Sequence, residues 1–127
     1  MMCAKKILVV DDEPIILDML EDAFSKVGYS VYLAANANEA FEILKQESIP
    51  LMFIDLGLAV MNGFELCKNI RKDNQGAIIY ALTGYAGVYK PQTMLEAGFD
   101  DCFTKPISIK DLYRVVKESF EKLDGYR

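Results

Sequence analysis

Short apolar runs alternate with segments of helical periodicity along the whole chain, and this alternation restricts the possible folds more than any other feature. Residues 7–10, 51–54 and 77–82 are continuously apolar, which is typical of strands buried on both faces of a parallel sheet. Strands that alternate with helices predict a doubly wound parallel α/β sheet with right-handed crossovers. The predicted strands cover residues 5–10, 29–34, 51–54, 77–82 and 100–104, and a helix is predicted after each.

Residues that cap or stop helices mark the ends of the predicted helices. Asn, Asp and Ser side chains accept hydrogen bonds from free N–H groups in the first turn, and Gly takes up the left-handed conformation at the other end. Asp12 is expected to cap the first helix, which has Pro14 in its first turn. Either Asn36 or Asn38 is expected to cap the second. The later helices are expected to start at Asn62, Pro91 and Ser108, and helices are expected to end at Gly28 and Gly98.

Asp55 directly follows the third apolar run, so it is predicted at the carboxyl end of a buried strand. Open α/β sheets bind ligands at this edge. Burial of an ionised carboxylate costs several kcal/mol unless a partner compensates it, so Asp55 indicates a nearby cation. Taken alone, Asp55 is equally compatible with a residue that caps the next turn.

Further polar residues follow the other predicted strands. Asp11 and Asp12 follow the first, Thr83 follows the fourth and Lys105 follows the fifth. Each has an ordinary alternative. Asp11 and Asp12 could be a helix cap and a solvated neighbour, Thr83 could be a turn residue, and Lys105 could be a surface lysine. Parallel strands share one carboxyl edge, however, and chance is a poor explanation for placing all of these residues there.

The set predicts phosphoryl chemistry. Clustered carboxylates repel one another and need a divalent cation, and the chain has no histidine to bind a softer metal. Oxygen ligands favour Mg²⁺, which readily bridges phosphoryl oxygens. Asp55 is then the expected nucleophile, forming an aspartyl-phosphate. Lys105 would supply a positive charge and Thr83 a hydroxyl to the phosphoryl oxygens.

Composition limits the remaining possibilities. The 127 residues suit one domain spanning 1–127. A net charge of −5 argues against direct nucleic-acid binding, and no apolar run approaches the roughly 20 residues of a membrane span. The 3 cysteines include no CxxC pair, which favours a reducing cytoplasm over a disulfide framework.

The chain resembles the receiver domain of two-component response regulators from end to end, in its stand-alone, chemotaxis-regulator-like form. Four segments carry the resemblance: residues 7–14, 54–63, 81–84 and 97–106. Each is weak alone, and all four in order are specific. The resemblance implies the flavodoxin-like (βα)5 fold with strand order 2-1-3-4-5. Because the chain ends soon after Lys105, we expect a stand-alone module or a receiver cut from a longer protein.

The resemblance also implies function. Asp55 would accept a phosphoryl group from a phosphohistidine on a sensor histidine kinase or a histidine phosphotransfer protein, and the domain would then switch its binding to a downstream protein. Asp11, Asp12, Asp55 and the backbone carbonyl of Gly57 would hold Mg²⁺. The domain would not be an enzyme beyond its own phosphorylation and dephosphorylation.

Two positions depart from the family pattern. Ala59 replaces a common Pro, and Cys102 replaces the usual Tyr or Phe three residues before the lysine. The small Cys102 predicts a muted switch, in which Tyr85 could substitute for the missing ring. One alternative function is an interaction module with this fold that is not phosphorylated. Another is a phosphohydrolase with an Asp nucleophile, which Gly57 disfavours because such enzymes usually carry a second Asp there.

Overall fold

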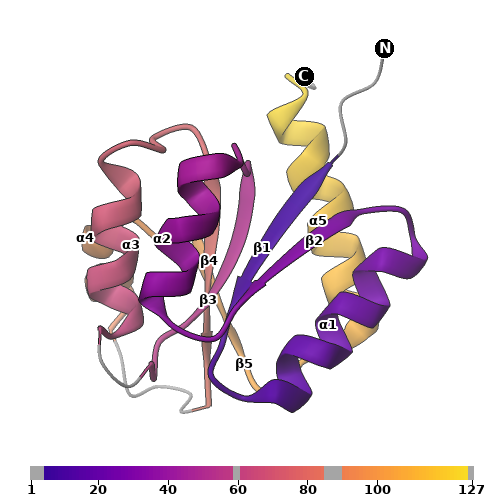
Figure 1. The fold of residues 1–127 in the computed structure, drawn as a ribbon, viewed down its shortest axis with the longest axis horizontal. Coiled ribbons are helices and arrows are strands. Elements are labelled where there is room, and N and C mark those ends of the chain that lie inside the picture. The colour runs from indigo at the N-terminus through magenta and orange to yellow at the C-terminus, as the bar shows by residue number, and fades with distance from the viewer. Residues whose placement is uncertain (1–4, 59–60, 85–89, 126–127) are drawn as a thin grey trace.

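The computed structural model describes residues 5–58, 61–84 and 90–125 of the chain. A parallel five-stranded sheet runs through its centre in the order β2-β1-β3-β4-β5, which confirms the predicted α/β fold (Figure 1). The strands are β1 Lys6–Val10, β2 Ser30–Ala34, β3 Leu51–Asp55, β4 Ile78–Thr83 and β5 Asp101–Thr104. The helices are α1 Pro14–Lys26, α2 Ala37–Gln46, α3 Gly63–Arg71, α4 Pro91–Ala97 and α5 Ile109–Leu123.

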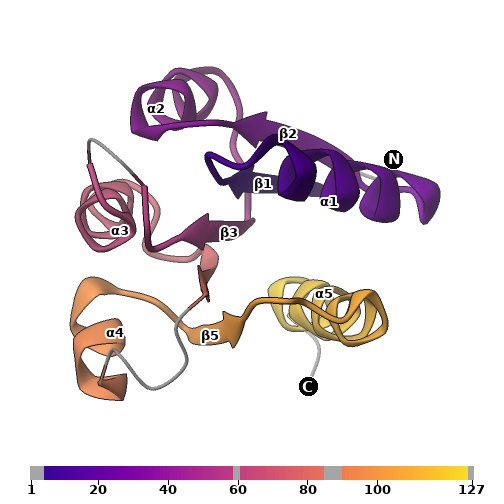
Figure 2. The same cartoon turned by 90° about the horizontal axis from the view of Figure 1, so that it is seen from below.

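Helices cover both faces of the sheet. Figure 2 shows α1 and α5 on one face and α2, α3 and α4 on the other. Side chains of a strand point alternately to the two faces, so β1 sends Ile7 and Val9 into the core under α1 and α5, and Leu8 and Val10 into the core under α2, α3 and α4. The central strands are therefore buried on both sides, as their continuous apolar runs predicted.

Most helix ends lie where the sequence placed them, and the first does not. The predicted cap at Asp12 is wrong, because Glu13 is the N-cap residue of α1. The Glu13 side chain makes no capping hydrogen bond; instead, its backbone N–H donates to Asp11 Oδ1 at 2.9 Å. Asn36, rather than Asn38, caps α2 by accepting from the Glu39 N–H at 2.9 Å. Asn62 and Ser108 cap α3 and α5 as predicted.

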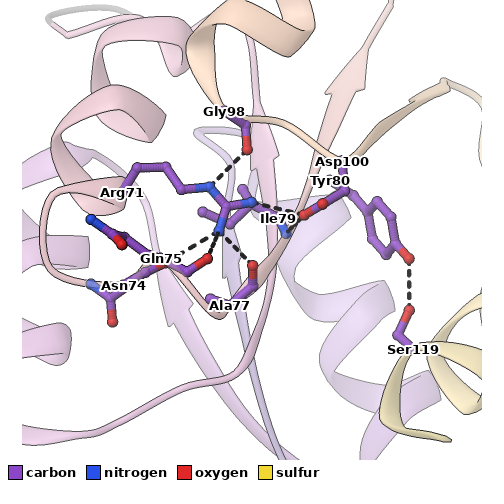
Figure 3. Close-up of polar contacts among 9 residues, drawn as sticks. All are labelled: Arg71, Asn74, Gln75, Ala77, Ile79, Tyr80, Gly98, Asp100 and Ser119. Carbon is purple, nitrogen blue, oxygen red and sulfur yellow. Dashed lines mark hydrogen bonds and ion pairs between the residues drawn. The ribbon is translucent and has the colours of Figure 1, made fainter. Parts of the chain in front are cut away.

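Arg71, the last residue of α3, joins three segments at the amino edge of the sheet (Figure 3). Its Nε donates to the Gly98 carbonyl at 2.8 Å, and Nη1 donates to the Ala77 carbonyl. Its Nη2 donates to Asp100 Oδ2 at 2.8 Å, and that oxygen also accepts the Ile79 N–H at 2.8 Å. The guanidinium therefore fixes the α4–β5 turn against the start of β4.

Gly98 is required where Arg71 crosses the α4–β5 turn. Its φ of 104° lies in the left-handed region, where it ends α4 as predicted. A Cβ atom at this position would also lie 2.7 Å from Arg71 Cγ, well inside van der Waals contact. The turn and the arginine are thus mutually dependent.

A buried pair of hydroxyl groups connects β4 to α5, on the face of the sheet that α1 and α5 cover (Figure 3). The Tyr80 hydroxyl lies 2.7 Å from Ser119 Oγ, and Ser119 Oγ donates to the Val115 carbonyl at 2.7 Å. Because the single serine proton is directed to Val115, Tyr80 is the donor in the pair.

Within the described part of the chain, no helix has the length and apolar character needed to cross a bilayer.

Candidate phosphoryl-acceptor site

The polar residues singled out from the sequence converge at the carboxyl edge of the sheet. Asp55 and Thr83 are the last residues of β3 and β4, Asp11 follows β1, and Lys105 follows β5. The Lys105 backbone N–H donates to the Thr83 carbonyl at 2.7 Å, which holds the two residues side by side. The cleft between these elements has a volume of about 420 Å³ and is lined by Asp12, Glu13, Asp55, Leu56, Gly57, Thr83, Gly84 and Lys105.

The carboxylates form a compact cluster. Asp11, Asp12 and Asp55 each present an oxygen within 4.8 Å of the other two. Asp11 is fully buried and Asp55 is 6% exposed, whereas Asp12 is exposed. Negative charges at such separations in a partly desolvated cleft repel strongly. The cluster therefore opposes folding unless positive charge compensates it.

Lys105 supplies part of that compensation. Its Nζ lies 2.8 Å from Asp11 Oδ2, 2.9 Å from Glu13 Oε1 and 3.6 Å from Asp55 Oδ1. Burial works against the charged ammonium, but its contacts with Asp11 and Glu13 and the charge of Asp55 raise the pKa of Lys105 above its usual value. The lysine is therefore cationic at neutral pH.

Compensation of the carboxylates by Lys105 is incomplete. Asp11 Oδ2 is buried and accepts no hydrogen bond of standard geometry from the residues that the structure describes, so the Lys105 ammonium, 2.8 Å away, compensates it as an ion pair. Burial and then the Asp11 charge raise the pKa of Asp55, although Lys105 and the Gly57 N–H oppose the rise. An under-satisfied, all-oxygen donor set of this kind fits a hard divalent cation.

Gly63 keeps the backbone around Asp55 in place. A Cβ atom at Gly63 would lie 2.5 Å from the Asp55 carbonyl oxygen and 2.8 Å from Leu56 Cα. The Gly63 N–H donates to the Leu56 carbonyl, and the Leu56 N–H donates to the Leu82 carbonyl at 2.9 Å. Only glycine therefore lets α3 begin directly against the end of β3. The sequence contained this residue in the motif after Asp55, but gave no reason for it.

The switch positions on β5 point to opposite faces. Cys102, paired with Ala81, is half-buried and packs against the core under α2, α3 and α4. Phe103 faces α1 and α5, with its ring centroid 5.2 Å from that of Tyr80. Because alternation fixes these directions, Phe103 does not fill the space of the aromatic that Cys102 replaces. Ala59 and Tyr85 lie outside the described residues.

Glu13 is the one charged residue lining the cleft to which the sequence analysis assigned no role. It lines the cleft, and its carboxylate pairs with Lys105, 92 positions away. The available signal was its position next to Asp11 and Asp12. That signal does not reveal a partner, because the contact depends on how the β1–α1 and β5–α5 connections approach each other.

The strand order and the acidic cluster at the carboxyl edge together define the class of receiver domains. The chain belongs to the response regulator receiver domain family, whose model matches residues 7–117. It is 32% identical to a CheY-like receiver domain protein from Methanospirillum hungatei JF-1, with a TM-score of 0.91 over 98% of this chain and 100% of that one.

Two further proteins are similar to this chain over more than 90% of its length. The response regulator TrrA from Thermotoga maritima, solved in complex with Mg²⁺-BeF, is 30% identical, with a TM-score of 0.81 over 91% of this chain and 98% of that one. The probable transcriptional regulator ycf27 of Porphyridium aerugineum is 38% identical over 120 residues, which cover 94% of this chain and 50% of that protein. The chain thus spans about half the length of this relative.

Membership of the receiver domain family indicates the function of the cleft. Receiver domains are phospho-acceptors rather than classical enzymes, and they interact with histidine kinases and with downstream targets. The pocket of Asp11, Asp12 and Asp55 is typical of a phospho-acceptor site. The chain is therefore a receiver domain of a two-component response regulator.

Proposed function

We propose that Asp55 is the phospho-acceptor of this receiver and that Mg²⁺ is held by Asp11, Asp12, Asp55 and the backbone carbonyl of Gly57. The observation that carries the proposal is the cluster of three carboxylates, within 4.8 Å of one another, opposite the Lys105 ammonium in one cleft. Asp55 lies at the end of a buried strand with Gly63 against its carbonyl, so the nucleophile is rigidly placed. A fixed nucleophile removes much of the entropic cost of the reaction.

The proposed reaction moves a phosphoryl group between two nucleophiles. An Asp55 carboxylate oxygen attacks phosphorus, the new O–P bond forms as the P–N bond to the phosphohistidine breaks, and the donor imidazole leaves. When bound, Mg²⁺ would offset the negative charge of the carboxylates and of the phosphoryl oxygens. Lys105 supplies a second positive charge to those oxygens, and the Thr83 hydroxyl supplies a hydrogen bond. The domain thereby promotes only its own phosphorylation and dephosphorylation.

The proposed partners follow from this chemistry. The donor is a sensor histidine kinase or a histidine phosphotransfer protein, since this chain has 0 histidines and cannot carry the phosphohistidine itself. The recipient of the signal is a downstream protein. Residues 1–127 form a single receiver domain that works in the cytoplasm, without direct contact with nucleic acid or membrane. The acidic composition, with pI near 4.7, supports the lack of nucleic-acid contact.

The test is intact-mass analysis after incubation with acetyl phosphate and Mg²⁺. We expect one phosphoryl adduct on the wild-type protein, lost in Asp55→Asn and in EDTA. Asp18→Asn is the matched control, because it makes the same substitution on the exposed surface of α1 and should keep the adduct. An adduct that persists in Asp55→Asn would place the acceptor elsewhere. A wild-type protein that forms no adduct would favour the unphosphorylated interaction module.

A further inference from the structure

Lys105 is shared unequally among three carboxylates. Its ammonium lies 2.8 Å from Asp11 and 2.9 Å from Glu13, but 3.6 Å from Asp55. The contact with Glu13 is a hydrogen bond, whereas the approach to Asp55 is beyond hydrogen-bonding distance. In this state the lysine is therefore drawn toward the β1–α1 connection and away from the proposed acceptor.

Glu13 is not a member of the cation cluster. The cluster that could hold an ion consists of Asp11, Asp12 and Asp55. Glu13 is the N-cap residue of α1, yet its side chain makes no capping hydrogen bond to the helix and reaches across the cleft to Lys105. Its pairing with the lysine therefore takes the place of the ordinary role of an N-cap side chain.

We propose that Glu13 is a positioning residue that holds the Lys105 ammonium off Asp55 in the unphosphorylated protein and competes with the phosphoryl group for that charge. This inference rests on the proposed function of Asp55 and adds a determinant of how readily the site takes up a phosphoryl group.

Of the two carboxylates closest to Lys105, Asp11 and Glu13, Glu13 is the one whose ion pair with the lysine can be broken more easily. The Asp11 side chain is fully buried, and its other oxygen is held by the Glu13 N–H at 2.9 Å. The Glu13 side chain is 59% exposed, so water can solvate its carboxylate once the lysine moves. An ammonium has three donors and a flexible stem, so Lys105 can keep its contact with Asp11 while it exchanges Glu13 for a phosphoryl oxygen.

The experiment uses two variants and one control. Glu13→Gln removes the charge and keeps the length, whereas Glu13→Asp keeps the charge and shortens the side chain by one methylene, which withdraws it from Lys105. Glu21→Gln is the control, because it makes the same change in net charge on an exposed part of α1. Beryllofluoride binding is measured by NMR titration at saturating Mg²⁺, with the Mg²⁺ affinity of each variant measured separately.

We expect both Glu13 variants to bind beryllofluoride about two- to fivefold more tightly than wild type, the range typical of losing one solvent-exposed ion-pair competitor. Their labelling by acetyl phosphate should accelerate in the same proportion, and Glu21→Gln should match wild type. Because Glu13 lies outside the cluster, Mg²⁺ affinity should change less than beryllofluoride affinity.

Four results would overturn the role of Glu13. Unchanged or weaker beryllofluoride binding by both variants would show that Glu13 does not compete. Tighter binding by Glu13→Gln alone would point to general repulsion of anions by its charge. A change confined to Mg²⁺ affinity would make Glu13 a contributor to the cation site. Failure of the wild-type protein to bind beryllofluoride at all would remove the proposed function as well, whereas the first three results leave it intact.

Discussion

Replacing Arg71 with Lys should destabilise the fold far more than the retained charge suggests. The guanidinium donates in three directions, to Gly98 O, to Ala77 O and to Asp100 Oδ2 (Figure 3). A lysine ammonium is a single point at the end of a flexible chain, and it cannot meet acceptors spread around a planar fork. At least two of these contacts are lost in Arg71→Lys.

The structure sets the size of the effect. Arg71 is only 19% exposed, so backbone carbonyls that it leaves are poorly solvated. A hydrogen bond to a charged group contributes about 1.5–3 kcal/mol, and the replacement lysine recovers part of this, so we expect a loss of about 2–4 kcal/mol. Arg114→Lys is the matched control, because its ion pairs at 3.9 and 3.7 Å are solvent-exposed and contribute about 0.5 kcal/mol at most.

Urea denaturation followed by circular dichroism measures both variants. The midpoint of Arg71→Lys should fall well below wild type with an unchanged slope, and Arg114→Lys should coincide with wild type. If the two variants differ by less than about 0.5 kcal/mol, in the range of ordinary surface substitutions, the network adds little to stability and the reasoning fails.

Two further predictions concern β4 and the site. Ser119→Ala should lower the free energy of unfolding by about 1–3 kcal/mol, because it leaves the buried Tyr80 hydroxyl unpaired. Tyr80→Phe should lower it by less, and the double variant should lose less than the sum of the two single losses. Additive losses in urea denaturation would contradict the pairing. Asp55→Asn should raise the melting temperature in EDTA. Burial and the Asp11 charge raise the pKa of Asp55 above 3.8, so this carboxyl favours folding when protonated and loses that contribution as the pH rises through its folded-state pKa. The advantage of Asp55→Asn should therefore be smallest near pH 3.8, grow as the pH rises from there, and shrink when Mg²⁺ is added. An advantage independent of pH would exclude this origin.

The fold could be predicted because its signals are local. Continuous apolar runs at 7–10 and 51–54 identify buried strands, and capping residues such as Asn62 and Ser108 identify helix starts. The error at Asp12 has a physical cause. Asp11 and Asp12 both precede Pro14, but the side chain that accepts a backbone hydrogen bond there is Asp11, which the end of β1 turns inward.

The site could be predicted only where its residues follow strands. Asp11, Asp55, Thr83 and Lys105 all lie at strand ends, and parallel topology alone brings them to one edge. The Arg71 network could not be found in this way, since most of its acceptors are backbone carbonyls, which any residue type carries. Glu13 escaped for a related reason, because its partner depends on the relative paths of two connections distant in sequence.

The two edges of the sheet have opposite energetics, and this division explains how the domain combines stability with reactivity. At the amino edge Arg71 satisfies carbonyls from the α4–β5 turn and from the start of β4. At the carboxyl edge the cluster around Asp55 concentrates negative charge and leaves Asp11 Oδ2 without a hydrogen bond from the described residues. Local rules of stability are commonly broken at functional sites and compensated elsewhere. Because β4 runs from one edge to the other, the hydrogen-bonded N–H of Ile79, its second residue, can hold the start of the strand in place while its last residue, Thr83, lines the cleft.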